Sequence, residues 1–156
     1  GFPVGACLAS EVAARGMTAG THGSTFGGNP LAMAVAGAAM ELALNEDFLP
    51  HVRMLGLKLR QKLAMLADRF PRIVETVRGE GLMIGIKCRV PNTDLVAAAR
   101  EQKLLTVGAG DNVVRLLPPL IIEESHLDEA MEKLEAACGA LDAGLDASAT
   151  AAGTKP

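Results

Sequence analysis

The residues best suited to chemistry lie in a glycine-rich loop over residues 20–32, which reads Gly-Thr-His-Gly-Ser-Thr-Phe-Gly-Gly-Asn-Pro-Leu-Ala. Its hydroxyl groups, among them those of Ser24 and Thr25, and its backbone N–H groups are donors that bind phosphate oxygens. Glycine lets the backbone approach a ligand closely. Asn29 and Pro30 are typical of a helix start, with Asn as cap. The loop therefore predicts an anion site just before a helix N-terminus.

The loop matches neither of two common phosphate-binding motifs. A P-loop requires Gly-Lys-Ser/Thr at the helix start, where this chain has Gly-Gly-Asn-Pro. A dinucleotide fingerprint requires Gly-x-Gly-x-x-Gly after a strand, which this segment lacks. The alternative interpretation is a solvated linker.

A second candidate is Arg115, which stands among apolar residues over 113–117. A charge in such a strand is costly unless a carboxylate meets it, and a guanidinium binds a carboxylate through two parallel hydrogen bonds. The alternative is an arginine on an edge strand that reaches solvent. Arg78 follows the same logic, and we expect it to anchor the Gly79–Gly81 turn or a domain interface.

The three histidines do not indicate a metal centre. We expect His22 to form hydrogen bonds with the loop backbone, and a proton carrier is the alternative. We expect His51 and His126 to be exposed at helix starts. Neither has a nearby Cys or His at metal-ligand spacing, so no metal site is predicted.

Composition and charge restrict the class of protein. The net charge is −3, with 21% charged residues of both signs, which favours neither nucleic acid nor an anionic membrane as a partner. No apolar run approaches the roughly 18 residues that span a bilayer. Cys7, Cys88 and Cys138 show no Cys-x-x-Cys spacing, which fits reduced thiols in a cytosol, and we expect Cys7 and Cys88 to be buried in strands.

The elements that must position these residues divide the chain into three parts. Residues 1–44 contain an expected buried strand, 2–10, and an expected helix, 30–45, that is apolar nearly all round. Residues 45–142 predict a compact α+β unit in the order helix–strand–strand–helix–strand–strand–helix. Residues 143–156 are mostly small and polar, and we expect a disordered tail.

Within the α+β unit, apolar spacing and turn residues place each element. Leucines at positions 55, 59, 63 and 66 form one apolar face of its first helix. The expected helices are 49–70, 91–103 and 125–141, and the expected strands are 73–78, 82–89, 104–107 and 113–117.

Four blocks of the sequence, in this order, resemble the class III aminotransferases, which are pyridoxal-phosphate (PLP) enzymes of fold type I. They are residues 1–6, 22–30, 77–85 and 114–120. The resemblance implies an α/β PLP transferase fold of which this chain is the C-terminal part: the edge of the large domain, then the α+β small domain.

The resemblance also implies roles for particular residues. Thr25 would bind the PLP phosphate of the partner subunit in a homodimer with shared active sites. Ser24 would lie beside the substrate, and Arg115 would face the active site and meet a substrate carboxylate or a protein glutamate. The cofactor-binding lysine would lie upstream of Gly1, so no residue of this chain is expected to be catalytic.

Within the family, the acetylornithine-type members are the most similar, which implies small-molecule substrates. These would be N2-acetylornithine and 2-oxoglutarate, in arginine biosynthesis in the cytoplasm. Ornithine, succinylornithine or 4-aminobutyrate as amino donor, and a non-catalytic stand-alone domain, are the alternatives.

Overall fold

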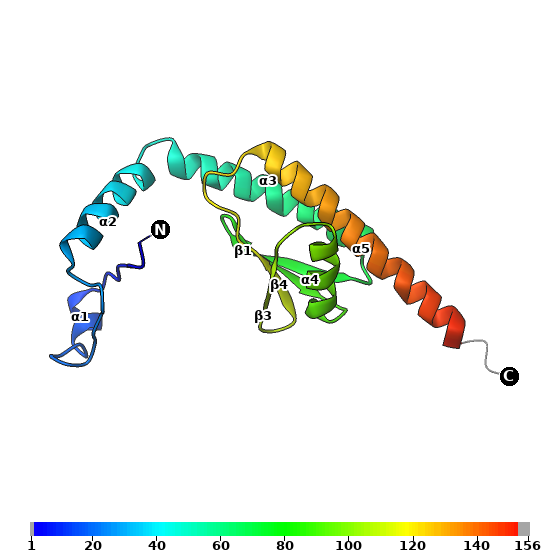
Figure 1. The fold of residues 1–156 in the computed structure, drawn as a ribbon, viewed down its shortest axis with the longest axis horizontal. Coiled ribbons are helices and arrows are strands. Elements are labelled where there is room, and N and C mark those ends of the chain that lie inside the picture. The colour runs from blue at the N-terminus through cyan, green and yellow to red at the C-terminus, as the bar shows by residue number, and fades with distance from the viewer. Residues whose placement is uncertain (1, 153–156) are drawn as a thin grey trace. The chain divides into compact units, whose positions relative to one another are not determined.

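The computed structural model of the chain describes residues 2–152 (Figure 1). Its contacts divide the chain after Leu49, close to the boundary predicted between residues 44 and 45. The first unit contains α1 (Glu11–Ala14) and α2 (Pro30–Ala43). The second contains a four-stranded sheet with its helices. No described helix is long and apolar enough to cross a membrane.

The first unit differs from its prediction in one element. Residues 2–10 form no strand and are largely exposed, so the predicted buried strand is wrong, as is the predicted burial of Cys7. A strand needs a neighbour to pair its backbone N–H and C=O groups, and no other described segment of this unit is a strand. One aromatic contact joins this segment to the glycine-rich loop: the rings of Phe2 and Phe26 meet edge to face, 5.9 Å apart.

Helix α2 forms where predicted, but it is not covered on most sides. Only Ala32 is buried, whereas several large apolar side chains are exposed within the described residues. The exposed side chains include Leu31, Met33, Met40 and Leu42. Helix propensity and the cap therefore define the helix, while residues 2–6 lie beside only part of its apolar surface and leave the rest exposed.

The second unit has the predicted order of elements. It comprises α3 (Phe48–Arg69), β1 (Val74–Glu80), β2 (Met83–Cys88), α4 (Asn92–Glu101), β3 (Val107–Ala109), β4 (Val113–Leu116) and α5 (Glu124–Ala152). The strands form one antiparallel sheet in the order β1-β2-β4-β3. The third strand lies later than the predicted 104–107, because residues 104–106 are irregular and pairing with β4 begins at Val107.

One face of the sheet packs against the helices and forms the core. Ile84, Ile86 and Val114 are fully buried on this face. The predicted leucine face of α3 packs here, since its leucines at 55, 59, 63 and 66 are all buried. Helix α5 contributes Leu127 and Leu134 to the same core. Figure 1 shows α3 and α5 running beside each other along the sheet.

Helix α5 is longer than predicted. It continues through Ala152, so the expected disordered tail is wrong over 143–152; residues 153–156 lie outside the described part of the chain. Alanine-rich sequence favours helix, and Arg72 holds the extension through ion pairs to Asp142 at 2.7 Å and Asp146 at 2.6 Å. The composition of residues 143–156 indicated few side chains to bury, but it did not reveal the ion pairs that Arg72 forms with this part of α5.

Candidate functional site

The glycine-rich loop is exposed, and its own residues define its shape. The hydroxyl oxygen of Ser24 accepts a hydrogen bond from the N–H of Gly27 at 2.9 Å. A Cβ on Gly27 would lie 2.8 Å from the Cβ of Ser24, so this turn requires glycine. Gly28 has φ +76°, in the left-handed region that favours glycine. The loop therefore forms a turn of defined shape that leads into α2.

Ser24 and Thr25 lie side by side in this turn, but their hydroxyl groups differ. Ser24 stabilises the turn, and it retains its O–H donor. The hydroxyl of Thr25 forms no hydrogen bond within the described residues, and the side chain is exposed. Thr25 is thus the donor that an external anion can use without breaking the turn.

The N-terminus of α2 offers fewer free N–H groups to an anion than the sequence suggested. The side-chain oxygen of Asn29 accepts hydrogen bonds from the N–H groups of Leu31 at 2.9 Å and Ala32 at 3.2 Å. The cap thus occupies N–H groups that would otherwise point to an anion. Anion binding by this loop depends on the hydroxyl groups and on the loop backbone.

The three histidines are exposed. His22 forms no hydrogen bond in the described part of the chain, so its expected bond to the loop backbone is absent. His51 contacts the carbonyl oxygen of Ile122 at 3.2 Å, and His126 accepts from the N–H of Glu123 through Nδ1. Among the described residues, no three His, Cys, Asp or Glu side chains come together as metal ligands.

Arg115 lies in the second unit, whereas Ser24 and Thr25 lie in the first. Its strand, β4, lies between β2 and β3, so the edge position in that alternative is wrong, while the expected exposure to solvent is found. The side chain is exposed on the open face of the sheet, opposite the core. Its guanidinium has no carboxylate partner among the described residues and is available to bind one.

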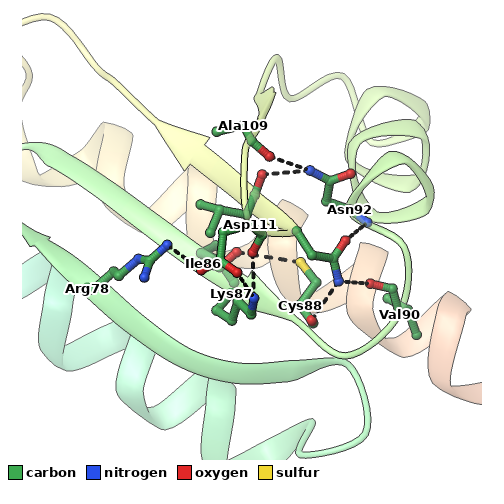
Figure 2. Close-up of polar contacts among 10 residues, drawn as sticks. Arg78, Ile86, Lys87, Cys88, Val90, Asn92, Ala109 and Asp111 are labelled. Atoms are coloured by element: carbon green, nitrogen blue, oxygen red, sulfur yellow. Dashed lines mark hydrogen bonds and ion pairs between the residues drawn. The ribbon is translucent and has the colours of Figure 1, made fainter.

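Arg78 does not anchor the turn that the sequence suggested. Its guanidinium donates to the carboxylate of Asp111 at 2.9 Å, and Lys87 binds the same carboxylate (Figure 2). The hydrogen bond from Lys87, followed by that from Arg78, holds the pKa of Asp111 below its usual value. Asp111 therefore stays ionised and links strands β1 and β2 to the β3–β4 turn.

The turn that carries Asp111 is fixed by an amide network that the sequence did not predict. Asp111 and Asn112 both have positive φ, +60° and +52°, in the left-handed region that Asn and Asp adopt more often than other non-glycine residues. The side-chain amide of Asn112 donates to the carbonyl oxygens of Cys88 at 2.7 Å and Val90 at 2.8 Å. Its oxygen accepts from the N–H of Asn92 at 2.7 Å. The available signal was the Asp-Asn pair, since both residues tolerate this conformation.

Asn92 completes the network from the start of α4. Its amide nitrogen donates to the carbonyl oxygens of Ala109 at 3.0 Å and Val113 at 2.9 Å (Figure 2). These bonds satisfy partly buried polar groups at the sheet edge. They also fix the hairpin β3–β4, which carries Arg115 and Asp111, against the rest of the unit.

Comparisons with known proteins agree with this fold. The family "Aminotransferase class-III" matches residues 1–138. Acetylornithine aminotransferase 1 of Bradyrhizobium diazoefficiens is 57% identical over 141 residues, which are 90% of this chain and 35% of that protein. The chain spans about a third of the length of the curated relatives it matches.

Solved structures give the same result. Ornithine delta-aminotransferase of Plasmodium falciparum matches with a TM-score of 0.75 and 33% identity, over 88% of this chain and 36% of that one. N-acetylornithine aminotransferase of Stenotrophomonas maltophilia matches with a TM-score of 0.67 and 32% identity, over 75% and 33%. The chain belongs to the class III aminotransferase family and has the PLP fold type I.

Proposed function

We infer that this chain is the C-terminal third of a PLP-dependent aminotransferase that moves the terminal amino group between N2-acetylornithine and 2-oxoglutarate. The observation that carries the proposal is the 57% identity, over 90% of the chain, to a relative named acetylornithine aminotransferase. The ornithine aminotransferase match is 33% identical, so ornithine is the second candidate donor. The reaction belongs to arginine biosynthesis, and three unpaired cysteines support a cytoplasmic location.

The glycine-rich loop has the chemistry to hold the cofactor phosphate. Thr25 offers an uncommitted hydroxyl beside Gly27 and Gly28, whose lack of side chains leaves room for close approach. Bound PLP supplies the electron sink for amino transfer, while protein groups bind and orient it. In this proposal the full-length protein is a homodimer, and Thr25 binds the phosphate in the partner subunit's site.

The open face of the small-domain sheet has the chemistry to hold a substrate carboxylate. Arg115 presents an exposed guanidinium without an internal partner, and guanidinium–carboxylate pairs form two parallel hydrogen bonds. Ser24 would face the substrate from the glycine-rich loop. The small molecules proposed as partners are thus acetylornithine and 2-oxoglutarate, with no nucleic acid and no membrane.

The test of substrate class is an assay of the full-length protein with acetylornithine, succinylornithine, ornithine and 4-aminobutyrate as amino donors and 2-oxoglutarate as acceptor. The proposal expects the highest kcat/KM with acetylornithine. A higher kcat/KM with ornithine would make ornithine the substrate. Absence of transamination with all four donors, in a folded protein that retains PLP, would refute the proposed function.

The test of the cofactor site is the PLP affinity of the dimeric apoprotein. Thr25→Ala removes a hydroxyl donor to a charged oxygen, worth about 1.5–3 kcal/mol, so affinity should fall roughly tenfold to a hundredfold. Thr18→Ala is the matched control, since this exposed residue lies in the same segment. Equal affinities for Thr25→Ala and wild type would show that Thr25 is only a turn residue.

The test of the carboxylate site is Arg115→Ala in the full-length protein. Losing a desolvated charge pair costs about 2–5 kcal/mol, so kcat/KM for 2-oxoglutarate should fall strongly while PLP is retained. Unchanged kinetics in both half-reactions would show that Arg115 only reaches solvent.

A further inference from the structure

Two histidines hold the same peptide group, the one that links Ile122 to Glu123. His51, near the start of α3, contacts the carbonyl oxygen of this group through Nε2 at 3.2 Å. Nδ1 of His126, near the start of α5, accepts a hydrogen bond from its N–H, also at 3.2 Å. The peptide group lies in the segment that connects β4 to α5 (Figure 1). It is therefore held by side chains of two different helices.

The partners determine which ring nitrogen carries a proton. A carbonyl oxygen only accepts, so Nε2 of His51 carries a proton, which is true of the neutral Nε2–H form and of the cation. A backbone N–H only donates, so Nδ1 of His126 is unprotonated and that ring is neutral. Acid therefore acts differently on the two histidines: protonation preserves the bond from His51 and abolishes the bond to His126.

The bond to His126 is one half of a capping box. The carbonyl oxygen of Glu123 accepts from the N–H groups of His126 at 3.2 Å and Leu127 at 3.4 Å. Glu123 is thus the capping residue of α5, and His126 is the third residue of the helix. In a capping box the third residue, a Glu or Gln, reaches back to the N–H of the capping residue. Here an imidazole does so, and imidazole changes its charge between pH 5 and 8.

The charged side chains near His126 lie on both helices and on the neighbouring segments. They are Glu123, the pairs Lys58–Glu124 and Lys62–Asp128 between α3 and α5, the pair Lys133–Glu129 within α5, and Lys103 beside the packed residues 104–105. Charge on His126 contributes, after the hydrogen bond from Lys133, to the lowered pKa of Glu129. A carboxylate attracts a protonated imidazole, but that ring has no lone pair to offer the N–H of Glu123. These charges therefore do not preserve the bond.

The held peptide group ends a segment, residues 117–123, that has few other backbone bonds. Two of its residues are prolines, which have no N–H, and the N–H of Ile122 donates to the carbonyl oxygen of Pro119 at 3.1 Å. The segment forms part of the wall of an apolar hollow of about 310 Å³, which His126 also lines. The two histidines therefore fix one wall of this hollow to α3 and α5.

We propose that His51 and His126 form a pH-sensitive clamp that holds residues 117–123 against α3 and α5 and releases the α5 side when His126 takes up a proton. The proton comes from solvent and adds to Nδ1, and the N–H of Glu123 then donates to water. His51 keeps its bond, so the segment stays attached to α3. The wall of the apolar hollow becomes mobile, while the core of the unit is unchanged.

The test is NMR of the 156-residue chain from about pH 8 to about pH 5. Long-range 1H–15N spectra identify the ring tautomers, and the amide signal of Glu123 reports its hydrogen bond. His126→Gln is the decisive variant, because Gln keeps an acceptor at every pH and is a normal third residue of a capping box. His22→Gln is the matched control, since His22 is an exposed histidine of the other unit. Signals of the buried residues Ile84 and Ile86 report whether each variant is folded.

At the upper pH, His126 should be the Nε2–H tautomer. As the pH falls, the amide signal of Glu123 and the methyl signals of Leu117 and Ile122 should move with the midpoint of the His126 ring. Protection of the Glu123 N–H from exchange, relative to an unstructured peptide at the same pH, should fall roughly threefold to tenfold, as expected for one hydrogen bond. In His126→Gln the protection should persist across the pH range.

An Nδ1–H tautomer of neutral His126 would overturn the proposal. So would an unchanged pH response of the Glu123 amide in His126→Gln, or loss of that response in His22→Gln. His51→Ala tests the other half of the clamp: exchange of the Ile122 N–H should rise roughly threefold at both ends of the pH range. Unchanged exchange in His51→Ala would show that the segment is not held by two histidines.

Discussion

The packing of α3 against the β1–β2 turn predicts an unusual effect of a glycine substitution. Gly56 is buried inside α3, where alanine would ordinarily stabilise a helix by about 0.8–1.0 kcal/mol. A Cβ at Gly56 would, however, lie 2.4 Å from the carbonyl oxygen of Gly81 and 2.8 Å from its carbon. These are backbone atoms of a turn whose Gly81 has φ +54°, so only movement of the hairpin relieves the clash.

The expected magnitude follows from two opposing contributions. Overpacking of a tight core costs about 1–3 kcal/mol, and contact with backbone places this case at the upper end. Subtracting the helix-propensity gain leaves Gly56→Ala less stable than wild type by about 1–2 kcal/mol. Gly144 in α5 is the matched control, because a Cβ there meets no atom within 4 Å. Gly144→Ala should therefore be more stable than wild type by up to about 1 kcal/mol.

The assay is urea unfolding of the whole chain, followed by far-ultraviolet circular dichroism because the sequence has no Trp or Tyr. The free energies of unfolding are compared at unchanged m-value, so that the difference reports stability. If Gly56→Ala is as stable as Gly144→Ala, the close approach of α3 to Gly81 does not exist in solution. The reasoning about how α3 supports the hairpin would then be wrong.

Three further predictions follow from charges and thiols. NMR titration should give Asp111 a pKa below its ordinary value; its stabilising effect is then present above the unfolded pKa, about 3.9, and lost as pH falls through the lower folded value. An ordinary pKa would exclude the ion pairs. Arg72→Gln should speed amide exchange in the last turns of α5, since Arg72 anchors them; unchanged exchange would refute the anchor. In the native chain Cys7 should react with a thiol reagent well before Cys88 and Cys138, because Cys7 is exposed, whereas burial raises the pKa of Cys138 to about 12 and also raises the pKa of Cys88. Equal rates would contradict the burial of these two thiols.

Periodicity was sufficient to predict the order of the elements in the second unit, because their apolar faces are buried against one another, although β3 lies later and α5 ends later than predicted. The leucines of α3 illustrate this: their spacing marks one helix face, and that face lies in the core. The same reasoning failed for residues 2–10 and for the exposed face of α2. A hydrophobic pattern indicates that a segment must be covered, but not whether the partner lies within the chain that is read.

The sequence predicted only part of the candidate site, and the reason differs from the one that applies to the helices and strands. The residues of the glycine-rich loop were found from local chemistry, since glycines, hydroxyls and a helix cap are adjacent in sequence. The relation between Arg78 and Arg115 is set by strand register across Gly85, and a one-residue slip would place side chains on the other face. Neither the register nor the central place of β4 can be read from the residues of one strand.

The turn at Asp111 and Asn112 explains how a charged open face can be held rigid on a small sheet. The side chains of these two adjacent residues form different contacts: one fixes the hairpin, and the other binds charged groups of the sheet. Asn112 bonds the ends of β2 and the start of α4, while Asp111 reaches Lys87 and Arg78. The polar bonds that fix the hairpin are partly buried, so water competes with them less than with the exposed ion pairs. The position of Arg78 therefore depends on an amide network that touches no ligand.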